Sequence, residues 1–264
     1  MKNIDKHFDV AQEILDLTEK ELENLIPVNI LVIGKSGVGK STLINNVFRE
    51  RLADTGIGKP VTKHLQKISR KDVPITLYDT RGLELTQIVQ DQVRQEIYRL
   101  IEQNQDTKEA LHVAYYCIQA TSSRIEESEI KLIKEISSKI PVILVLTQAI
   151  GEQAKVFHRY LEELNLPVVQ VHSLLAEPFV LSKDVTIEAF GLKELIEKTF
   201  HIIPESVRKA FINAQRVDIE RKVESAKNWA SRYIVTSFGV GFIPIPFSDA
   251  SLLVPMQVAL LAHL

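Results

Sequence analysis

The stretch VNILVIGKSGVGKSTLINNVF occupies positions 28–48 and holds the pattern G-x-x-x-x-G-K-[ST] at positions 34–41. The apolar run 28–33 before the pattern predicts a buried strand, and the residues after it predict the start of a helix. A strand, a glycine-rich turn and a helix N-terminus together form a cradle for phosphate groups, because backbone N–H groups and the helix dipole both point at the anion. This context favours a phosphate-binding loop over a chance match in a Gly/Ser loop.

The residue types of this loop suit the chemistry of a nucleoside triphosphate. Glycines at 34, 37 and 39 let the backbone turn its N–H groups inward without a Cβ in the way. Lys40 is expected to reach the β- and γ-phosphates, and the Ser41 hydroxyl is expected to be a ligand of Mg²⁺. The loop residues predicted to bind nucleotide are Lys35, Ser36, Gly37, Val38, Gly39, Lys40, Ser41 and Thr42.

The composition is that of an ordinary globular protein. The 264 residues are 45% hydrophobic and 25% charged, with a formal net charge of -2, so nothing favours DNA or RNA as a partner. The single cysteine, Cys117, excludes a disulfide within the chain, and a small buried hydrophobe is its expected role. The polar N-terminus has no apolar signal-peptide core behind it, so we expect a cytoplasmic enzyme.

Apolar runs alternate with amphipathic helical patterns along the chain, which predicts an α/β fold. The predicted strands are 28–34, 65–69, 74–79, 111–118, 141–147 and 167–172, and the predicted helices are 40–51, 84–104, 126–139, 151–165 and 190–202. Helices between apolar strands imply crossover connections, and hence a mainly parallel sheet with helices on both faces. The segment 65–69 alternates imperfectly, and an antiparallel edge strand fits it.

Three segments divide the chain. Residues 1–26 predict an N-terminal helix, residues 27–203 the phosphate-binding domain, and residues 204–264 a C-terminal helical and partly hydrophobic module. Within this module positions 234–264 carry almost no charge, but Pro and Asp residues interrupt them. A membrane span needs about 20 apolar residues in a helix, so a simple span is not expected. The alternatives are a module close to a membrane or a partner, and a hydrophobic hairpin that folds back or dimerises.

A second motif, Asp-Thr-Arg-Gly at positions 79–82, ends the predicted strand 74–79 and has the form D-x-x-G. After a strand that follows the phosphate loop, this pattern is typical of the metal- and γ-phosphate-sensing segment of a nucleotide switch. Asp79 is expected to hold Mg²⁺, and the Gly82 N–H to reach the γ-phosphate.

The segment 53–64 lies between the two motifs and carries glycines with few large apolar groups, as a mobile switch requires. We assign Thr62 the role of completing Mg²⁺ coordination and sensing the γ-phosphate, so Lys40 and Thr62 are the predicted catalytic residues. Thr55 is the alternative to Thr62 for this role. The other interpretation is that both threonines are solvated loop residues.

With these motifs, residues 28–200 resemble the translation-factor-related class of small P-loop GTPases, in particular the Era-like group. The resemblance implies GTP/GDP as ligand, Mg²⁺ as cofactor and a molecular switch as function. Some members of this class have a glutamine after D-x-x-G that orients the attacking water, whereas this chain has Leu83. The resemblance therefore implies slow hydrolysis and a catalytic group from elsewhere. Arg81 is either a cis arginine finger or a structural switch residue.

Guanine is normally read in this class by N/T-K-x-D after the strand near 147. Here that place holds Thr147-Gln148-Ala149-Ile150. Thr147 stands in for the first residue, Gln148 covers the base as a lysine stem would, and Ile150 occupies the place of the aspartate that pairs with guanine. A shifted loop with Glu152 is the alternative source of a carboxylate. Guanine preference is thus implied by the resemblance alone.

The loop after the last predicted strand is expected to place a backbone N–H near the base oxygen. Ser173 and Ala176 are the two candidates for this contact.

The segment 204–264 resembles the C-terminal region of YcjF-type membrane-associated proteins. This resemblance implies a membrane or protein partner for residues 234–264 and a place at the periphery of the inner membrane. A homodimer belongs to the alternative, in which these residues form a hydrophobic hairpin that folds back or dimerises.

The predicted function is therefore a Mg²⁺-dependent, slowly hydrolysing GTP switch. One alternative is an ATP-using P-loop enzyme, which Ile150 suggests, and another is a nucleotide-binding scaffold without turnover, which Leu83 suggests. A self-assembling GTPase of the membrane-remodelling or immunity-related kind is the third.

Overall fold

The computed structural model describes residues 25–48, 57–70, 73–81, 83, 86–183 and 185–215. Residues 1–24 of the predicted N-terminal helix and residues 216–264 of the predicted C-terminal module lie outside these residues, as do Thr55 and Gly82. Apart from Leu25, the described residues belong to one compact unit, Ile26–Val217. Within them, no helix combines the length and the apolar character that crossing a membrane requires.

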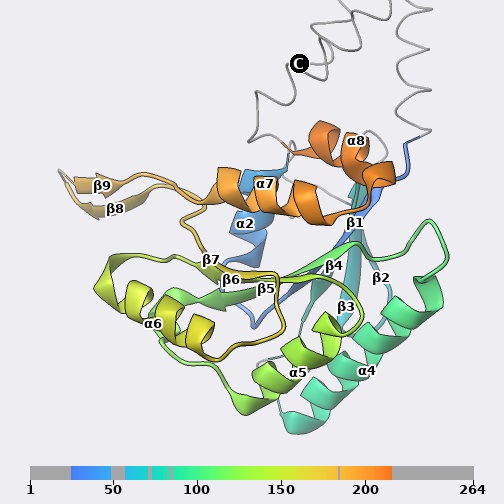
Figure 1. Ribbon diagram of the computed structural model, residues 1–264, viewed down its shortest axis with the longest axis horizontal. Helices are drawn as coiled ribbons and strands as arrows, with labels where there is room; N and C mark the ends of the chain where they lie inside the picture. The colour runs from blue at the N-terminus through green and yellow to red at the C-terminus, as the bar shows by residue number, and fades with distance from the viewer. Residues whose placement is uncertain are drawn as a thin grey trace, which may run out of the picture. The chain divides into compact units, whose positions relative to one another are not determined.

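A seven-stranded sheet forms the centre of this unit, in the order β2-β3-β4-β1-β5-β6-β7 (Figure 1). Its strands are β1 (Val28–Ile33), β2 (Ile57–Pro60), β3 (Leu65–Arg70), β4 (Val73–Thr80), β5 (Val113–Gln119), β6 (Val142–Thr147) and β7 (Gln170–Ser173). From β4 to β7 all neighbours are parallel, as predicted, whereas β2 and β3 are antiparallel. The prediction that 65–69 forms an edge strand was wrong, because β3 pairs with β4 on one side and with β2 on the other.

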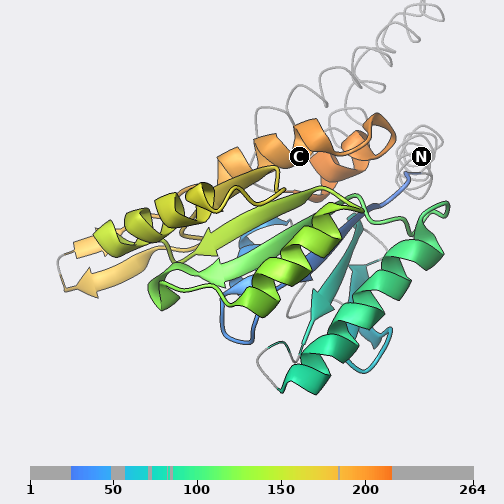
Figure 2. The same ribbon diagram turned by 60° about the horizontal axis from the view of Figure 1, so that its bottom comes forward.

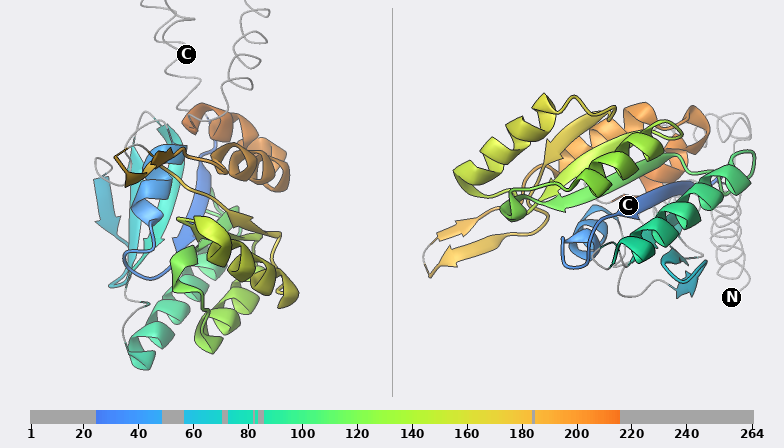
Figure 3. Two further views of the ribbon diagram at one scale, coloured as in Figure 1. Left: turned by 90° about the vertical axis from the view of Figure 1, so that its left-hand side faces the viewer. Right: turned by 90° about the horizontal axis from the view of Figure 1, so that it is seen from below.

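Helices cover both faces of the sheet, which confirms the predicted α/β fold. They are α2 (Lys40–Val47), α4 (Gln87–Asn104), α5 (Glu127–Ser137), α6 (Gly151–Glu163), α7 (Leu192–Ile202) and α8 (Glu205–Ala214). On β1, Ile30 and Val32 pack on the side of α2, α7 and α8, while Leu31 and Ile33 pack on the side of α4, α5 and α6. Figure 2 and Figure 3 show the sheet between these two groups of helices. Successive side chains of a strand point to opposite faces, so an all-apolar strand supplies both cores.

Helix α8 belongs to the same core as the sheet. Val207 and Phe211 are fully buried against the cluster that contains Ile30 and Val32. The predicted boundary between residues 203 and 204 therefore falls inside this compact unit, between two helices that pack on one face. Pro204 sits just before the first turn of α8, where its missing N–H costs nothing.

A separate antiparallel hairpin, β8 (Phe179–Ser182) with β9 (Val185–Ile187), follows β7 and was not predicted. Figure 1 shows it projecting away from the main sheet. Its strands are only three to four residues long, and β8 is exposed along its whole length. Such short strands carry too little periodicity to be recognised from the sequence.

Candidate nucleotide-binding site

The predicted phosphate loop connects β1 to α2 and adopts a backbone that depends on glycine. The φ angles of Gly34, Gly37 and Gly39 are 150°, 78° and 91°. A Cβ on Gly34 would lie 2.5 Å from the backbone oxygen of Cys117 on β5, so the loop also needs glycine for close packing. Cys117 is buried, as predicted, and burial raises the pKa of its thiol to about 12.

Lys40, the first residue of α2, folds its side chain back over this loop. Its Nζ donates to the backbone oxygens of Gly34 at 2.7 Å and of Lys35 at 3.1 Å, and it lies 4.0 Å from Oδ1 of Asp79. The side chain is nearly buried, so solvent screens its charge little. The ammonium group thus lies between the loop and the end of β4, where a phosphate group would need a positive charge.

Asp79 has an unsatisfied carboxylate oxygen. Its Oδ1 is buried and accepts no hydrogen bond from the described residues. Burial raises the pKa of Asp79 above its usual value, against the opposing charges of Lys40 and Arg81. Mg²⁺ prefers oxygen ligands, and both this carboxylate and the Ser41 hydroxyl line the same cleft. The residues present therefore fit the metal that the sequence predicted.

The cleft itself is open and has a volume of about 680 Å³. It is lined by Ser36, Gly37, Gly39, Lys40, Ser41, Thr42, Lys63, His64, Asp79, Thr80, Arg81 and Gln148. The structure thus brings together the phosphate loop, the end of β4 and the residue after β6. These meet because the carboxyl ends of parallel strands lie at one edge of a sheet.

Thr62 makes a different contact from the one predicted for it. Its hydroxyl donates to the carboxylate of Glu96 on α4, and it accepts the backbone N–H of Leu65 at 3.1 Å. Thr62 is not among the residues lining the cleft, although the next two residues of the chain are. Its predicted metal role would require the hydroxyl to leave Glu96.

Glu96 also holds His64, and neither residue stood out in the sequence. One carboxylate oxygen lies 3.0 Å from His64 Nδ1, and the other accepts the His64 backbone N–H at 3.2 Å. Burial raises the pKa of Glu96, but the hydrogen bonds from Thr62 and His64 outweigh burial and keep the pKa below its usual value. No local pattern marks Glu96, because it meets His64 only through packing of α4 on the sheet.

At the end of β6, where the sequence predicts that the base binds, the side chains of Thr147 and Gln148 bond to other parts of the protein. Thr147 donates to the backbone oxygens of Val38 at 2.5 Å and Ile118 at 3.3 Å, which ties the phosphate loop to β6. Gln148 has a φ of 51°, and its side-chain oxygen accepts from Gln119 at 2.7 Å. Of the described residues that line the cleft, Asp79 is the only one with a carboxylate.

The remaining predicted base-side residues lie around α6 and the loop after β7. Ile150 precedes the first residue of α6, and Glu152 is an exposed residue paired with Lys155 at 2.6 Å. The Ser173 hydroxyl lies 2.7 Å from Nδ1 of His158, and Ala176 packs against the core. None of the four residues Ile150, Glu152, Ser173 and Ala176 lines the cleft.

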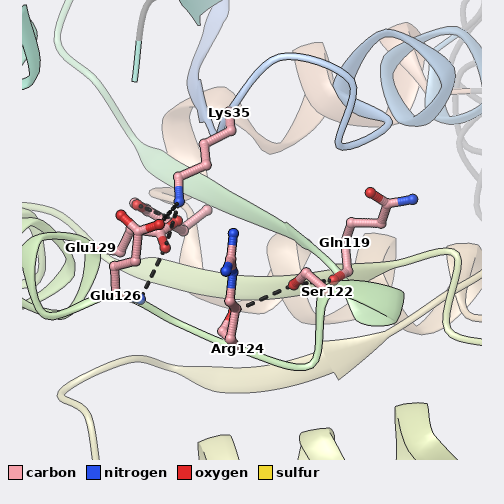
Figure 4. A network of polar contacts seen from close by, with 7 residues as sticks. Lys35, Gln119, Ser122, Arg124, Glu126 and Glu129 are labelled. Carbon is pink, nitrogen blue, oxygen red and sulfur yellow. Dashed lines mark hydrogen bonds and ion pairs between the residues drawn. The ribbon is translucent and has the colours of Figure 1, made fainter. Parts of the chain in front are cut away.

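Lys35 anchors the phosphate loop to α5 (Figure 4). Its Nζ lies 2.7 Å from Oε1 of Glu126 and 3.2 Å from Oε2 of Glu129. Glu129 is nearly buried and also accepts from the backbone N–H of Glu126 and the hydroxyl of Tyr116. Burial lowers the pKa of Lys35, but the two carboxylates together raise it above its ordinary value. Lys35 is outside the cleft lining, so its side chain holds the loop in place.

The two residues flanking the undescribed Gly82 point their side chains differently. Arg81 lines the cleft, and its guanidinium donates to the Gln66 side chain. Leu83 is 6% exposed and packs with Leu65, Tyr78 and Val93 in the core below α4. The position after D-x-x-G therefore supplies a core side chain.

Comparison with known proteins places these features in a family context. Residues 29–148 match the model of a family described as 50S ribosome-binding GTPase. Cell division control protein 10 of Saccharomyces cerevisiae is 30% identical over 145 residues, 44% of this chain and 45% of that protein. The tRNA modification GTPase MnmE of Syntrophomonas wolfei is 23% identical over 218 residues, 80% of this chain and 42% of that protein. The G domain of the T. maritima FeoB iron transporter has a TM-score of 0.41 and 18% identity, over 66% of this chain and 98% of that one.

The family match runs from β1 to the residue after β6, the part of the chain that builds the cleft. Together with the sheet order, it shows that this part has the fold of a P-loop GTPase domain. The matched segments span less than half of the length of the two curated relatives. The finer likenesses to the Era-like group and to YcjF-type proteins stay predictions.

Proposed function

We propose that this chain binds GTP together with Mg²⁺, hydrolyses it slowly and acts as a nucleotide-dependent switch. The observation that carries the proposal is the placement of the Lys40 ammonium 4.0 Å from the Asp79 carboxylate, in one cleft with the backbone of the phosphate loop. A cation beside inward-turned glycine N–H groups binds phosphate, and the buried Asp79 oxygen, which has no hydrogen-bond partner among the described residues, fits a metal ion.

Each residue has a distinct task in this proposal. Lys40 binds the β- and γ-phosphates, and the backbone from Ser36 to Thr42 binds phosphate oxygens at the N-terminus of α2. Ser41 and Asp79 hold Mg²⁺, and Thr62 joins them when its hydroxyl leaves Glu96. Mg²⁺, when bound, neutralises negative charge on the phosphates.

The proposal that the base is guanine is supported by the similarity to proteins described as GTPases, and not by a carboxylate in the cleft. The matching family and MnmE are both described as GTPases. Thr147 and Gln148 border the base side, with a backbone N–H of Ser173 or Ala176 for the base oxygen. Because Ile150 replaces the base-reading carboxylate, we expect weaker discrimination between guanine and adenine than a carboxylate would give.

The switch would consist of the segments 53–64 and 82–90, which respond to the γ-phosphate. Residues 234–264 would couple this response to a membrane surface or a protein, with a homodimer as one form of that association. Peripheral association with the inner membrane and a cytoplasmic location belong to the same proposal.

The first test is calorimetric titration of the purified chain with GTP, GDP and ATP in the presence of Mg²⁺. We expect binding of guanine nucleotides to the parent chain and no measurable binding to Lys40→Ala, because that variant lacks the cation between the loop and Asp79. Lys209→Ala changes an exposed cation on α8, outside the cleft lining, and serves as the matched control that should bind like the parent.

The outcomes separate the proposal from its rivals. An ATP preference would move the chain to ATP-using P-loop enzymes. Tight binding without single-turnover hydrolysis would make it a nucleotide-binding scaffold. If Lys40→Ala binds as tightly as the parent, the phosphate-loop assignment is wrong.

A further inference from the structure

Hydrolysis at this site lacks an obvious side chain to hold the attacking water. Leu83, which follows D-x-x-G, is buried in the core with Tyr78 and Val93. A leucine offers no hydrogen bond in any case. Within the described part of the chain, the candidates for orienting the water are the other residues that line the cleft, and this inference rests on the proposed GTP hydrolysis.

His64 lines the cleft together with Lys40 and Asp79, although it comes from a different segment of the chain. It directly precedes β3, and its backbone oxygen accepts the N–H of Arg81 at 2.9 Å, at the end of β4. This bond fixes His64 beside the D-x-x-G segment. Its position is thus set by the antiparallel pairing of β3 with β4.

Glu96 fixes the ring of His64 in addition to its backbone. The Nδ1 to Oε1 distance is 3.0 Å, and the ring is nearly buried. An ionised carboxylate only accepts hydrogen bonds, so Nδ1 carries the hydrogen. Nε2 then lies on the side of the imidazole away from Glu96, where a ring nitrogen that carries no hydrogen can accept a hydrogen bond. An imidazole oriented by a carboxylate through its other nitrogen is a recurring arrangement for handling a water proton.

The other described side chains in the cleft suit different tasks. Lys40, Lys63 and Arg81 are cations that only donate. Ser41 and Asp79 are the proposed metal ligands, and Gln148 lies on the base side, paired with Gln119. The hydroxyls of Ser36, Thr42 and Thr80 also line the cleft, but His64 is the described lining residue that carries an imidazole, and Glu96 holds that ring through Nδ1.

We propose that His64, positioned by Glu96, accepts a hydrogen bond from the attacking water and aims its oxygen at the γ-phosphorus of GTP. The water oxygen forms a bond to phosphorus while the bond from phosphorus to the β–γ bridging oxygen breaks. GDP leaves with that electron pair, and the proton of the water ends on inorganic phosphate. His64 is thus a catalytic residue, and Glu96 is a positioning residue.

The test is single-turnover hydrolysis of GTP with Mg²⁺ by the full chain, beside the dissociation constant for GTPγS. We expect His64→Ala to lower the rate about 100-fold, the lower end for a positioned acid–base group. Its affinity for GTPγS should stay within about 3-fold of the parent. Added imidazole should restore part of the rate of His64→Ala, which a merely structural role of the ring would not allow.

Glu96 is tested by comparing two substitutions. Glu96→Ala should lower the rate at least about 10-fold, because the ring loses its orienting partner. Glu96→Gln should lose less, since its amide oxygen still accepts from Nδ1. The matched control is His201→Ala, which changes an exposed histidine on α7 outside the cleft and should hydrolyse at the parent rate.

Three results would overturn the inference or its premise. A His64→Ala rate within 3-fold of the parent, with binding intact, removes His64 and leaves the proposed GTPase standing. Loss of rate only in proportion to lost binding makes His64 structural. A parent chain that binds no GTP refutes the proposed function itself. If His64→Ala does not fold, His64→Gln decides by the same rate criterion.

Discussion

At the scale of single residues, the motifs identified those side chains whose neighbours are fixed by local geometry. Lys40 and Gln148 come after the ends of β1 and β6, and Asp79 lies in the last two residues of β4, so a parallel sheet places them in one cleft. Glu96 and His64 left no comparable signal, because they meet through packing between elements distant in sequence. The same holds for Thr62, whose contact with Glu96 depends on where α4 lies.

Gly34 offers a test of the loop at this scale. Its φ is 150°, and an added Cβ would approach the Cys117 oxygen to 2.5 Å, so Gly34→Ala must shift the backbone. We expect a loss of about 2 kcal/mol or more in the free energy of unfolding, measured by urea denaturation without nucleotide.

Gly37→Ala is the matched control for Gly34→Ala. It has a positive φ of 78° but no atom within 4 Å of an added Cβ, so it should lose only about 1 kcal/mol. Equal losses in the two variants would show that contact with Cys117 does not matter.

At the scale of elements, the strands of the parallel sheet and the helices between them were predictable, whereas β2 and the β8–β9 hairpin were not. Strands β1, β5 and β6 are mostly apolar, and the predicted bounds of these strands and of β4 agree with the structure within two residues. The four residues of β2, Ile-Gly-Lys-Pro, have no strand pattern of their own and pair only because β3 offers an edge. Helix α7 begins at residue 192 and not at 190, because Gly191 has a φ of 81°.

The contact between the phosphate loop and α5 predicts a dependence of stability on pH. Glu126 has a pKa held below its usual value, chiefly by the hydrogen bond from Lys35. A lowered carboxyl pKa in the folded state means stability that is present above the unfolded pKa and is lost as pH falls through the folded one. Glu126→Gln should remove this pH-dependent contribution to the free energy of unfolding. The contribution is less than about 1 kcal/mol because Glu126 is partly exposed.

Urea denaturation of parent and variant at a series of pH values measures this dependence. The two free energies of unfolding should differ near neutral pH and converge below about pH 4. Glu127→Gln changes the next, exposed residue of α5 and should keep the parental dependence. A constant difference between parent and Glu126→Gln at all pH values would contradict the ionic origin of the effect.

At the scale of the whole described unit, α8 determines how far the domain extends. Residue composition changes near 203, which suggested a boundary there, but burial of Val207, Phe211 and Ala214 places α8 in the core of the sheet. Composition counts exposed and buried residues together. A helix with many charged residues on its exposed face can therefore still pack an apolar face against the core.

Phe211→Ala tests this extent of the domain. Its side chain is fully buried, so we expect a loss of about 3–5 kcal/mol in the free energy of unfolding, measured by urea denaturation. Lys209→Ala, on the exposed side of α8, should stay within about 0.5 kcal/mol of the parent. Similar values for the two variants would separate α8 from the core.

The bridge between Phe48 and Gln215 joins the end of α8 to the end of α2. Phe48 is the residue at which α2 stops, and α2 begins at Lys40 in the phosphate loop. A pull on the chain at Gln215 would therefore reach Phe48 through this bridge, at the opposite end of α2 from Lys40. A mechanical load and an occupied phosphate site would act on opposite ends of the same short helix.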